Sequence, residues 1–261
     1  MPSEAAPGLW RPQWQAEPQV GALMSTRAGG VSRAPWDSLN LGVAVGDDPV
    51  AVAENRRRFV AATGARPLWL QQVHGHHVVK AGGAALADAE PPQADAAWTD
   101  EPGVACVVQV ADCLPVLLAA PEGKAVAAAH AGWRGLAGGV VEAALSALCE
   151  AAACAPQEVA AWLGPCIGPR RFEVGADVLR AFGESPQGAD PQRFVSGAAA
   201  GDGVPRWFAN LPQLARERLQ RAGVRHVSGG SWCTVEDRTT FFSYRRDGIT
   251  GRLAAAVWIR G

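Results

Sequence analysis

The stretch that decides the fold covers residues 103–149 and reads GVACVVQVADCLPVLLAAPEGKAVAAAHAGWRGLAGGVVEAALSALC. Three apolar runs within it are typical of buried strands: residues 104–110, 115–120 and 125–129. Asp112 and Cys113 lie between the first two runs, and His130 follows the third. The pattern therefore places a thiol and an imidazole where strands end, and such ends are common positions for functional side chains on a rigid scaffold.

Further elements are expected on both sides of this stretch. Strands are predicted at residues 20–25, 68–73, 76–80, 159–163, 226–228, 239–244 and 253–259. Helices are predicted at residues 49–64, 138–153, 176–182 and 210–222. Strands and helices intermix without regular βαβ alternation, which favours an α+β fold with a mixed sheet or a sheet pair covered by helices. Residues 1–18 are expected to form an N-terminal arm, and residues 19–261 a single domain.

Composition excludes several classes of protein. The chain has 261 residues, 48% of them apolar, and a net charge of -1. This balance gives no basic face of the kind that nucleic acid or an anionic membrane requires. The first residues lack the pattern of a signal peptide, and no apolar run is long enough to span a membrane. We therefore expect a cytoplasmic protein, in which the six cysteines are thiols, ligands or nucleophiles rather than disulfides.

Three residues form the first candidate site: His74, Cys113 and His130. Each is predicted to close a strand, and strand ends can converge in space although they are distant in sequence. Zinc prefers imidazole nitrogen and thiolate sulfur, and catalytic zinc sites leave one position open. The alternative is a buried cysteine with two hydrogen-bonded histidines. His76 or His77 could also replace His74, although both are expected on the surface.

A second interpretation makes Cys113 a nucleophile that His130 deprotonates. Asp112 is expected on the opposite face of the strand, where it could cap a turn. Cys166, in the segment GPCIG, is a rival nucleophile on an irregular turn. The simpler alternative for Cys166 is a small residue packed in a tight loop.

Five arginines lie in or beside Gly-containing loops, where a guanidinium and backbone donors together can hold phosphate or carboxylate: Arg27, Arg134, Arg245, Arg246 and Arg252. Arg134 is the strongest candidate because it lies near a helix start that favours an anion. Trp133 could stack on a heterocycle, although a core position is the usual one for tryptophan.

With these residues assembled, the sequence resembles the YfiH-like family, also called the laccase-domain, polyphenol oxidase or peptidoglycan editing factor family. Seven segments carry the resemblance in order: STRAGGVS (25–32), NLG (40–42), QVHG (72–75), ADCLP (111–115), HAGWRG (130–135), GPCIG (164–168) and RRDGITGR (245–252). The resemblance covers nearly the whole chain. It implies a two-sheet core flanked by helices and a zinc ion held by His74, Cys113 and His130.

The resemblance also implies an activity. Family members are described as phosphorylases of adenosine, inosine and guanosine, with adenosine deaminase and methylthioadenosine phosphorylase activity. Cys113, His130 and Asp112 are then the expected catalytic residues, with Glu173 as an alternative to Asp112 for proton transfer. Purine nucleoside and phosphate are the expected partners, and their candidate contacts are Arg27, Asn40, Trp133, Arg134 and Arg246. A monomer is expected.

Two other activities remain open. A copper-dependent polyphenol oxidase is possible because copper competes well for nitrogen and sulfur ligands. However, the five histidines of this chain are too few for a multicopper centre. The second alternative is an amidase that removes L-serine from a peptidoglycan precursor, with either a Cys-His pair or a zinc-activated water.

Overall fold

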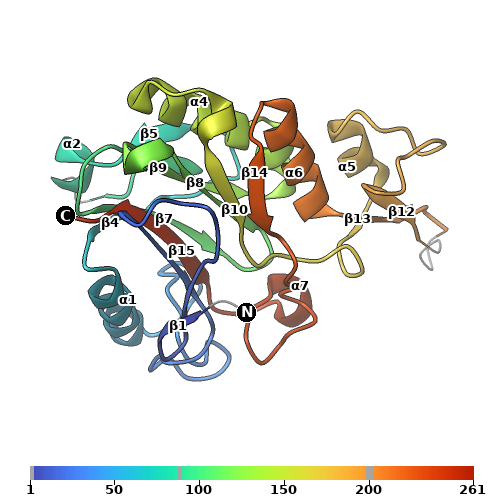
Figure 1. The fold of residues 1–261 in the computed structure, drawn as a ribbon. Helices are drawn as coiled ribbons and strands as arrows, with labels where there is room; N and C mark the ends of the chain where they lie inside the picture. The colour runs from blue at the N-terminus through green and yellow to red at the C-terminus, as the bar shows by residue number, and fades with distance from the viewer. Residues whose placement is uncertain (1–2, 88–89, 198–202) are drawn as a thin grey trace.

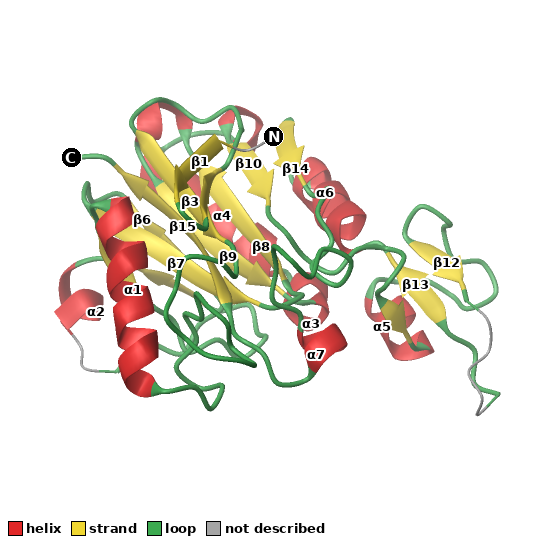
Figure 2. Ribbon diagram, turned by 90° about the horizontal axis from the view of Figure 1, so that it is seen from below, coloured by secondary structure: helices red, strands yellow, loops and turns green. Residues whose placement is uncertain are grey.

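The computed structural model describes residues 3–87, 90–197 and 203–261. Two β-sheets stack face to face, and helices cover their outer surfaces (Figures 1 and 2). The first sheet contains, in spatial order, β1 (Ser3–Ala6), β2 (Leu9–Arg11), β3 (Val20–Ser25), β15 (Leu253–Ile259), β7 (Val104–Val110) and β4 (Arg66–Leu68). The second contains β14 (His226–Gly229), β10 (Ala160–Leu163), β8 (Leu114–Ala119), β9 (Val126–Ala131), β6 (Ala96–Thr99) and β5 (Val78–Lys80).

Helices enclose the two sheets from both sides. The first sheet packs against α1 (Pro49–Thr63), and the second packs against α4 (Val140–Ala152) and α6 (Leu211–Arg221). A small third sheet stands at one side of the molecule with α5 (Ala176–Ala181), at the right of Figure 2. Its strands are β11 (Glu173–Val174), β13 (Trp207–Ala209) and β12 (Phe194–Ser196). Short helices α2 (Gly83–Ala87), α3 (Trp133–Ala137) and α7 (Tyr244–Asp247) lie in the connections.

The central strands are buried on both faces, which explains their unbroken apolar character. In β7, Val104, Cys106, Val108 and Val110 pack between the two sheets, whereas Ala105 and Val107 pack on the side of α1. Because successive strand residues point to opposite faces, each of these strands contributes to two cores. The stack of helix, sheet, sheet and helix therefore confirms the α+β fold with packed mixed sheets.

Several predicted elements match the structure closely. The strands expected at residues 20–25, 104–110 and 253–259 are β3, β7 and β15. The start of α1 also follows its sequence signals, since the side chain of Asp48 accepts a hydrogen bond from the Val50 N–H at 2.9 Å. Helix α6 is capped in the same way by Asn210.

Two predicted strands are wrong, because side chains capture backbone groups that a strand would have paired. Only Leu68 of the segment 68–73 lies in a strand, since Asp95 binds the backbone that follows. The segment 239–244 is a loop that leads into α7, whose N-terminus is capped by Ser243. The segment 1–18, expected as an arm, contributes β1 and β2 to the edge of the first sheet.

Candidate metal centre

His74, Cys113 and His130 converge in the fold although they are far apart in sequence. One potential ligand atom from each lies within 4.8 Å of the other two. The sulfur of Cys113 is 3.8 Å from Nε2 of His74, and the two imidazole rings lie 4.9 Å apart at an angle of 77°. Within the part of the chain that the structure describes, this is the group of histidine, cysteine and carboxylate residues able to hold a metal ion.

The three side chains come from different local structures, and only one lies in a strand. His130 belongs to β9, near its end, and Cys113 directly precedes β8. His74 lies in a loop with a left-handed backbone (φ 61°). The prediction that all three residues close strands is therefore wrong for His74, which lies in a loop, and for Cys113, which precedes a strand instead of ending one.

Asp95, which no sequence motif marked, holds two of the three residues in place. Its fully buried carboxylate accepts hydrogen bonds from the backbone N–H groups of Val73, His74 and Gly75, at 3.1, 2.9 and 2.7 Å. The same carboxylate lies 2.8 Å from Nδ1 of His130. Burial raises the pKa of Asp95, but these hydrogen bonds outweigh burial and lower it. An ionised carboxylate only accepts, so Nδ1 of His130 carries a proton, and Nε2 is the nitrogen that can bind a metal once its own proton is lost.

The only sequence signal for Asp95 was a lone acidic residue directly before an apolar strand. A buried carboxylate is rare without a partner, and that rarity could have marked Asp95 as a candidate. Its partner, His130, is 35 residues away, so no local pattern marks the pair.

Gly132 allows the cluster to form. A Cβ atom at this position would lie 3.0 Å from both the Cys113 sulfur and Cδ2 of His74. Three residues later, a Cβ atom on Gly135 would lie 2.6 Å from the carbonyl oxygen of Gly75. The two glycines of HAGWRG therefore let this segment pack directly on the loop of His74.

Thiol and imidazole shift each other's ionisation in opposite directions. Burial raises the pKa of Cys113, but the charge and hydrogen bond of His130, with those of His74, outweigh burial and lower it to about 6. Burial lowers the pKa of His130, whereas the Cys113 thiolate and Asp95 raise it to about 9. The metal-free pair is therefore a thiolate beside an imidazolium near neutral pH.

This donor set fits zinc. Two imidazoles and one thiolate are typical zinc ligands, and three protein ligands leave a position for water or substrate. The lowered pKa of Cys113 favours the ionised sulfur that zinc binds, and Asp95 orients one of the two imidazoles, as is common for metal-bound histidine. His76 and His77, the alternatives to His74, are exposed and line a separate cavity beside α4.

Asp112 ties three loops together beside Cys113. Its carboxylate accepts hydrogen bonds from the Thr234 hydroxyl at 2.5 Å and from the Arg245 N–H at 2.6 Å. Its carbonyl oxygen accepts from the Ile167 N–H at 2.9 Å. Because both carboxylate oxygens are engaged and the backbone is left-handed (φ 95°), Asp112 is built to fix the backbone next to Cys113.

A cavity of about 900 Å³ opens over the cluster and contains all three residues. Trp133 and Arg134 line it, and the Arg134 guanidinium lies over the Trp133 ring at 4.3 Å. Aromatic and apolar side chains from distant parts of the sequence complete the wall, among them Trp69, Phe172, Leu211 and Tyr244. A cavity of this size can hold a small organic molecule together with an anion.

Of the other residues predicted to contact substrate, Arg245 and Arg252 line this cavity, whereas Arg27, Asn40 and Arg246 do not. Arg27 pairs with Asp37 at 3.3 Å, and the Arg246 guanidinium donates to the carbonyl oxygens of Thr234, Val235 and Phe241. Asn40 is fully buried and binds neighbouring backbone. Glu173 is exposed in β11.

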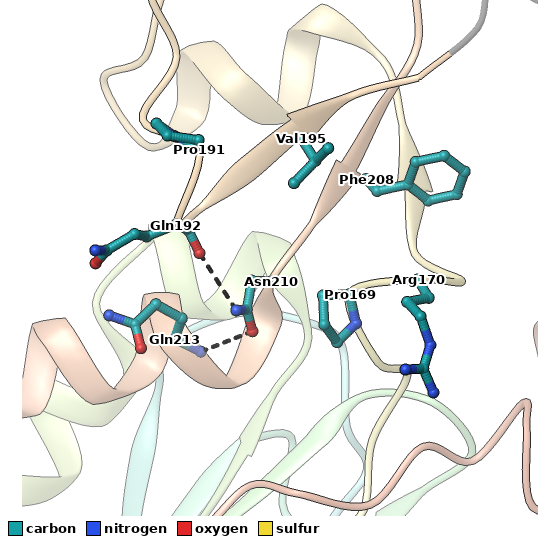
Figure 3. A pocket seen from close by; sticks show the side chains of 8 residues that line it. All are labelled: Pro169, Arg170, Pro191, Gln192, Val195, Phe208, Asn210 and Gln213. Atoms are coloured by element: carbon teal, nitrogen blue, oxygen red, sulfur yellow. Dashed lines mark hydrogen bonds between the residues drawn. The ribbon is translucent and has the colours of Figure 1, made fainter.

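A second cavity, of about 670 Å³, lies between α6 and the third sheet (Figure 3). The side chain of Asn210 is occupied by structural bonds, since it accepts from the Gln213 N–H and donates to the Gln192 carbonyl, as the dashed lines show. Arg170 pairs with Glu236 at 2.7 Å. The metal-ligand cluster belongs to the larger cavity, which is the better candidate for a reaction site.

The fold is a stacked two-sheet α+β domain, and its His-Cys-His cluster opens to a cavity. These features are those of a protein that binds a metal ion next to a small-molecule site. The family model described as multi-copper polyphenol oxidoreductase laccase matches residues 21–260. The chain belongs to this family, the YfiH-like family that its motifs indicate. In the described part of the chain, no helix has the length and apolarity needed to cross a membrane.

Close relatives cover almost the whole chain. A protein of Pseudomonas aeruginosa named purine nucleoside phosphorylase is 49% identical, covering 95% of this chain and 97% of its own. Purine nucleoside phosphorylase YfiH of Shigella flexneri is 46% identical, with the same coverage. A crystal structure from Neisseria meningitidis superposes with a TM-score of 0.87 at 45% identity, covering 97% of this chain and all of that one.

Proposed function

We propose that this protein cleaves purine nucleosides by phosphorolysis at the His-Cys-His cluster. A phosphate oxygen attacks C1′ of the ribose, and the N-glycosidic bond breaks. Its electron pair stays on the base nitrogen, which takes up a proton. The products are the free base and ribose 1-phosphate. The observation that carries this proposal is the cavity that opens over His74, Cys113 and His130, and the names of the relatives support it.

His74, Cys113 and His130 would hold a zinc ion on this proposal. When bound, zinc supplies a Lewis acid that polarises substrate atoms. Asp95 keeps the proton of His130 on Nδ1 and so presents Nε2 to the site. Asp112, which was expected to be catalytic, acts as a positioning residue here, because its carboxylate oxygens already accept hydrogen bonds from Thr234 and Arg245.

The base and the sugar would contact the aromatic wall of the cavity. Trp133 offers an indole ring close to the cluster, and Arg134 already covers one side of that ring. Gln109 lines the cavity, and only its backbone is bound to Gln72. A side-chain amide in this position offers one donor and one acceptor group to the edge of a purine.

Deamination of adenosine and phosphorolysis of methylthioadenosine belong to the same proposal, because both substrates share the purine ring and the ribose. Deamination replaces the amino group at C6 of adenine with oxygen from water and releases ammonia. It requires no phosphate, so one experiment with and without phosphate separates the two reactions.

The test is incubation of the zinc-loaded protein with adenosine, inosine, guanosine or methylthioadenosine, with and without inorganic phosphate. Liquid chromatography follows the bases and nucleosides. We expect phosphate-dependent release of base together with ribose 1-phosphate, and loss of turnover in Cys113→Ala. Absence of turnover of all four nucleosides would refute the proposal. Metal analysis of the same preparation distinguishes zinc from copper, and a phenolic substrate tests the oxidase alternative.

A further inference from the structure

Two arginines in the cavity wall, Arg56 and Arg252, form no salt bridge within the part of the chain that the structure describes. Both line the cavity that contains His74 and Cys113. Both are half-buried, and among the residues that the structure describes neither forms an ion pair. Many arginines of this chain do so, including Arg27 and Arg193. A partly desolvated cation without a directly paired carboxylate is stabilised when a further anion joins it.

Arg56 is held rigidly by two contacts. Its Nε donates to the carbonyl oxygen of Leu41 at 2.8 Å, and its guanidinium lies 3.9 Å from the centre of the Trp69 ring. These contacts fix the plane of the guanidinium, and within the described structure its two terminal nitrogens donate to no protein acceptor. Burial lowers the pKa of Arg56 to about 10, so the group stays charged near neutral pH.

Arg252 is fixed by the same short segment, residues 40–42. Its backbone N–H donates to Oδ1 of Asn40 at 2.8 Å, and its carbonyl oxygen accepts from the Leu41 N–H at 3.0 Å. A Cβ atom on Gly42 would lie 2.7 Å from Cγ of Arg252. The glycine at position 42 therefore leaves space for the Arg252 side chain. Nη1 of Arg252 donates to the carbonyl oxygens of Thr250 and Gly251. The Nε and Nη2 groups of Arg252 therefore remain available to bind an anion.

The segment Asn40-Leu41-Gly42 therefore positions both guanidinium groups at one cavity. Asn40 is itself buried and also binds Asp47 at 2.8 Å, so the segment is anchored independently of any ligand. Arg252 lies within electrostatic range of Cys113 and Asp112. The arginine pair thus belongs to the same site as the metal-ligand cluster.

We propose that Arg56 and Arg252 form an oxyanion subsite that binds free inorganic phosphate beside the metal-ligand cluster. The inference deepens the proposed function, on which it rests, by assigning the place of the second substrate. Planar guanidinium forks with fixed donors match the oxygens of a tetrahedral anion. Among the other arginines that the sequence marked, Arg27 and Arg246 are engaged in structural bonds, and Arg134 covers the Trp133 ring.

The test is calorimetric titration of the zinc-loaded protein with inorganic phosphate alone. We expect Arg56→Met and Arg252→Met each to weaken phosphate binding by about 10- to 100-fold, as the loss of charge-assisted hydrogen bonds implies. Arg225→Met is the matched control, because Arg225 is exposed and lies outside the cavity wall. Unchanged phosphate affinity in both cavity variants would overturn the proposal.

Milder variants keep the test decisive if a methionine variant fails to fold. Arg56→Lys and Arg252→Lys retain the charge but lose the fork, and we expect phosphate binding to weaken several-fold while thermal unfolding stays near that of the wild type. In steady-state assays the same variants should raise KM for phosphate more than KM for the nucleoside. An equal rise in both would contradict a phosphate subsite.

A nucleotide offers the same anionic group, so adenosine 5′-monophosphate is titrated in parallel. Arginine-dependent binding of the nucleotide without binding of free phosphate would overturn the assignment to the second substrate. Arginine-dependent phosphate binding by a protein that turns over no nucleoside would leave the subsite standing and refute the proposed function. If the protein turns over nucleosides but both arginine variants bind phosphate as the wild type does, the proposed function stands and the phosphate subsite is refuted.

Discussion

Two cysteines in adjacent loops show how differently the same side chain behaves in this protein. Cys113 precedes β8, and Cys166 follows β10, its antiparallel neighbour; the loops are joined by the hydrogen bond from the Ile167 N–H to the Asp112 carbonyl. The imidazoles lower the pKa of Cys113 to about 6 against the effect of burial. Burial, followed by the charges of Cys233, Asp112 and Cys113, raises the pKa of Cys166 well above its usual value.

The comparison shows that neighbours decide which thiol is reactive, rather than the irregularity of its loop. Both cysteines lie in Gly- or Pro-containing turns, and the sequence left them as rivals. Cys166 is fully buried and its thiol faces the Ile167 carbonyl at 3.5 Å. Cys113 opens to the cavity and lies beside His74 and His130. A thiolate needs such cationic partners to be stable near neutral pH.

The strongest way to break this comparison is to remove each sulfur in turn. Cys113→Ala deletes one of three ligands, and we expect the metal content to fall from about one ion per chain to none. Cys166→Ala should retain the metal, because Cys166 is not one of the three clustered ligands. Metal analysis of both variants, purified in parallel, measures the difference. Equal metal content in the two variants would contradict the assigned centre.

Alkylation sharpens the same contrast in the metal-free protein. With a pKa of about 6, Cys113 is about nine-tenths thiolate at pH 7, whereas Cys166 stays protonated. We expect Cys113 to react with iodoacetamide roughly 100-fold faster or more, with a rate midpoint near pH 6, as followed by peptide mass spectrometry. A midpoint near the usual value for cysteine would refute the imidazole effect.

The sign of the pH dependence follows from the lowered pKa of Cys113. The thiolate's contribution to folding stability is complete above its usual pKa of 9.0, decreases as the pH falls, and is absent below about pH 6. Metal affinity should fall as the pH drops below about 9, where a metal must displace a proton from His130, and fall more steeply below about pH 6, where protons also compete for the sulfur.

Asp95 provides the next test, since it supports the cluster without belonging to it. Asp95→Asn removes the carboxylate that orients His130 and binds the loop of His74. Changes of this kind typically cost about 10- to 100-fold in metal affinity. The alkylation midpoint of Cys113 should also rise, because a less cationic His130 stabilises the thiolate less. Chelator competition measures the affinity; Asp100→Asn, an exposed change near the same strand, is the control.

The smallest effect is expected for the stability of Cys166→Ala. Removing one buried sulfur leaves a small void, and we expect a loss of about 1 kcal/mol. For a chain of this length the unfolding temperature should fall by roughly 2–4 °C, measured by calorimetry. A loss several times larger would show that the thiol has a further structural partner.

Much of the fold could be predicted because the central strands are unbroken runs of apolar residues. Residues 104–110 and 253–259 are apolar at nearly every position, and β7 and β15 are buried on both faces. Caps such as Asp48 and Asn210 were readable as well, since their side chains bond backbone groups only two or three residues away. Local hydrogen bonds and burial patterns are thus visible in the sequence.

The chemistry of the site was only partly visible. The motifs marked His74, Cys113 and His130 as the residues to examine, because zinc chemistry restricts the side chains that can serve. They gave no indication of Asp95, which acts through residues 21 and 35 positions away. Arg56 was missed for a similar reason: it lies in the middle of α1 and meets the cavity only through the packing of residues 40–42.

The sequence by itself determined which segments are buried strands, where helices begin, and which side chains could bind a metal, because these properties depend on neighbours within a few residues. Only the tertiary structure decided which thiol ionises, which carboxylate orients the imidazole, and which arginines face the cavity. Those properties depend on distance in space, and electrostatic and hydrogen-bond energies fall steeply with that distance.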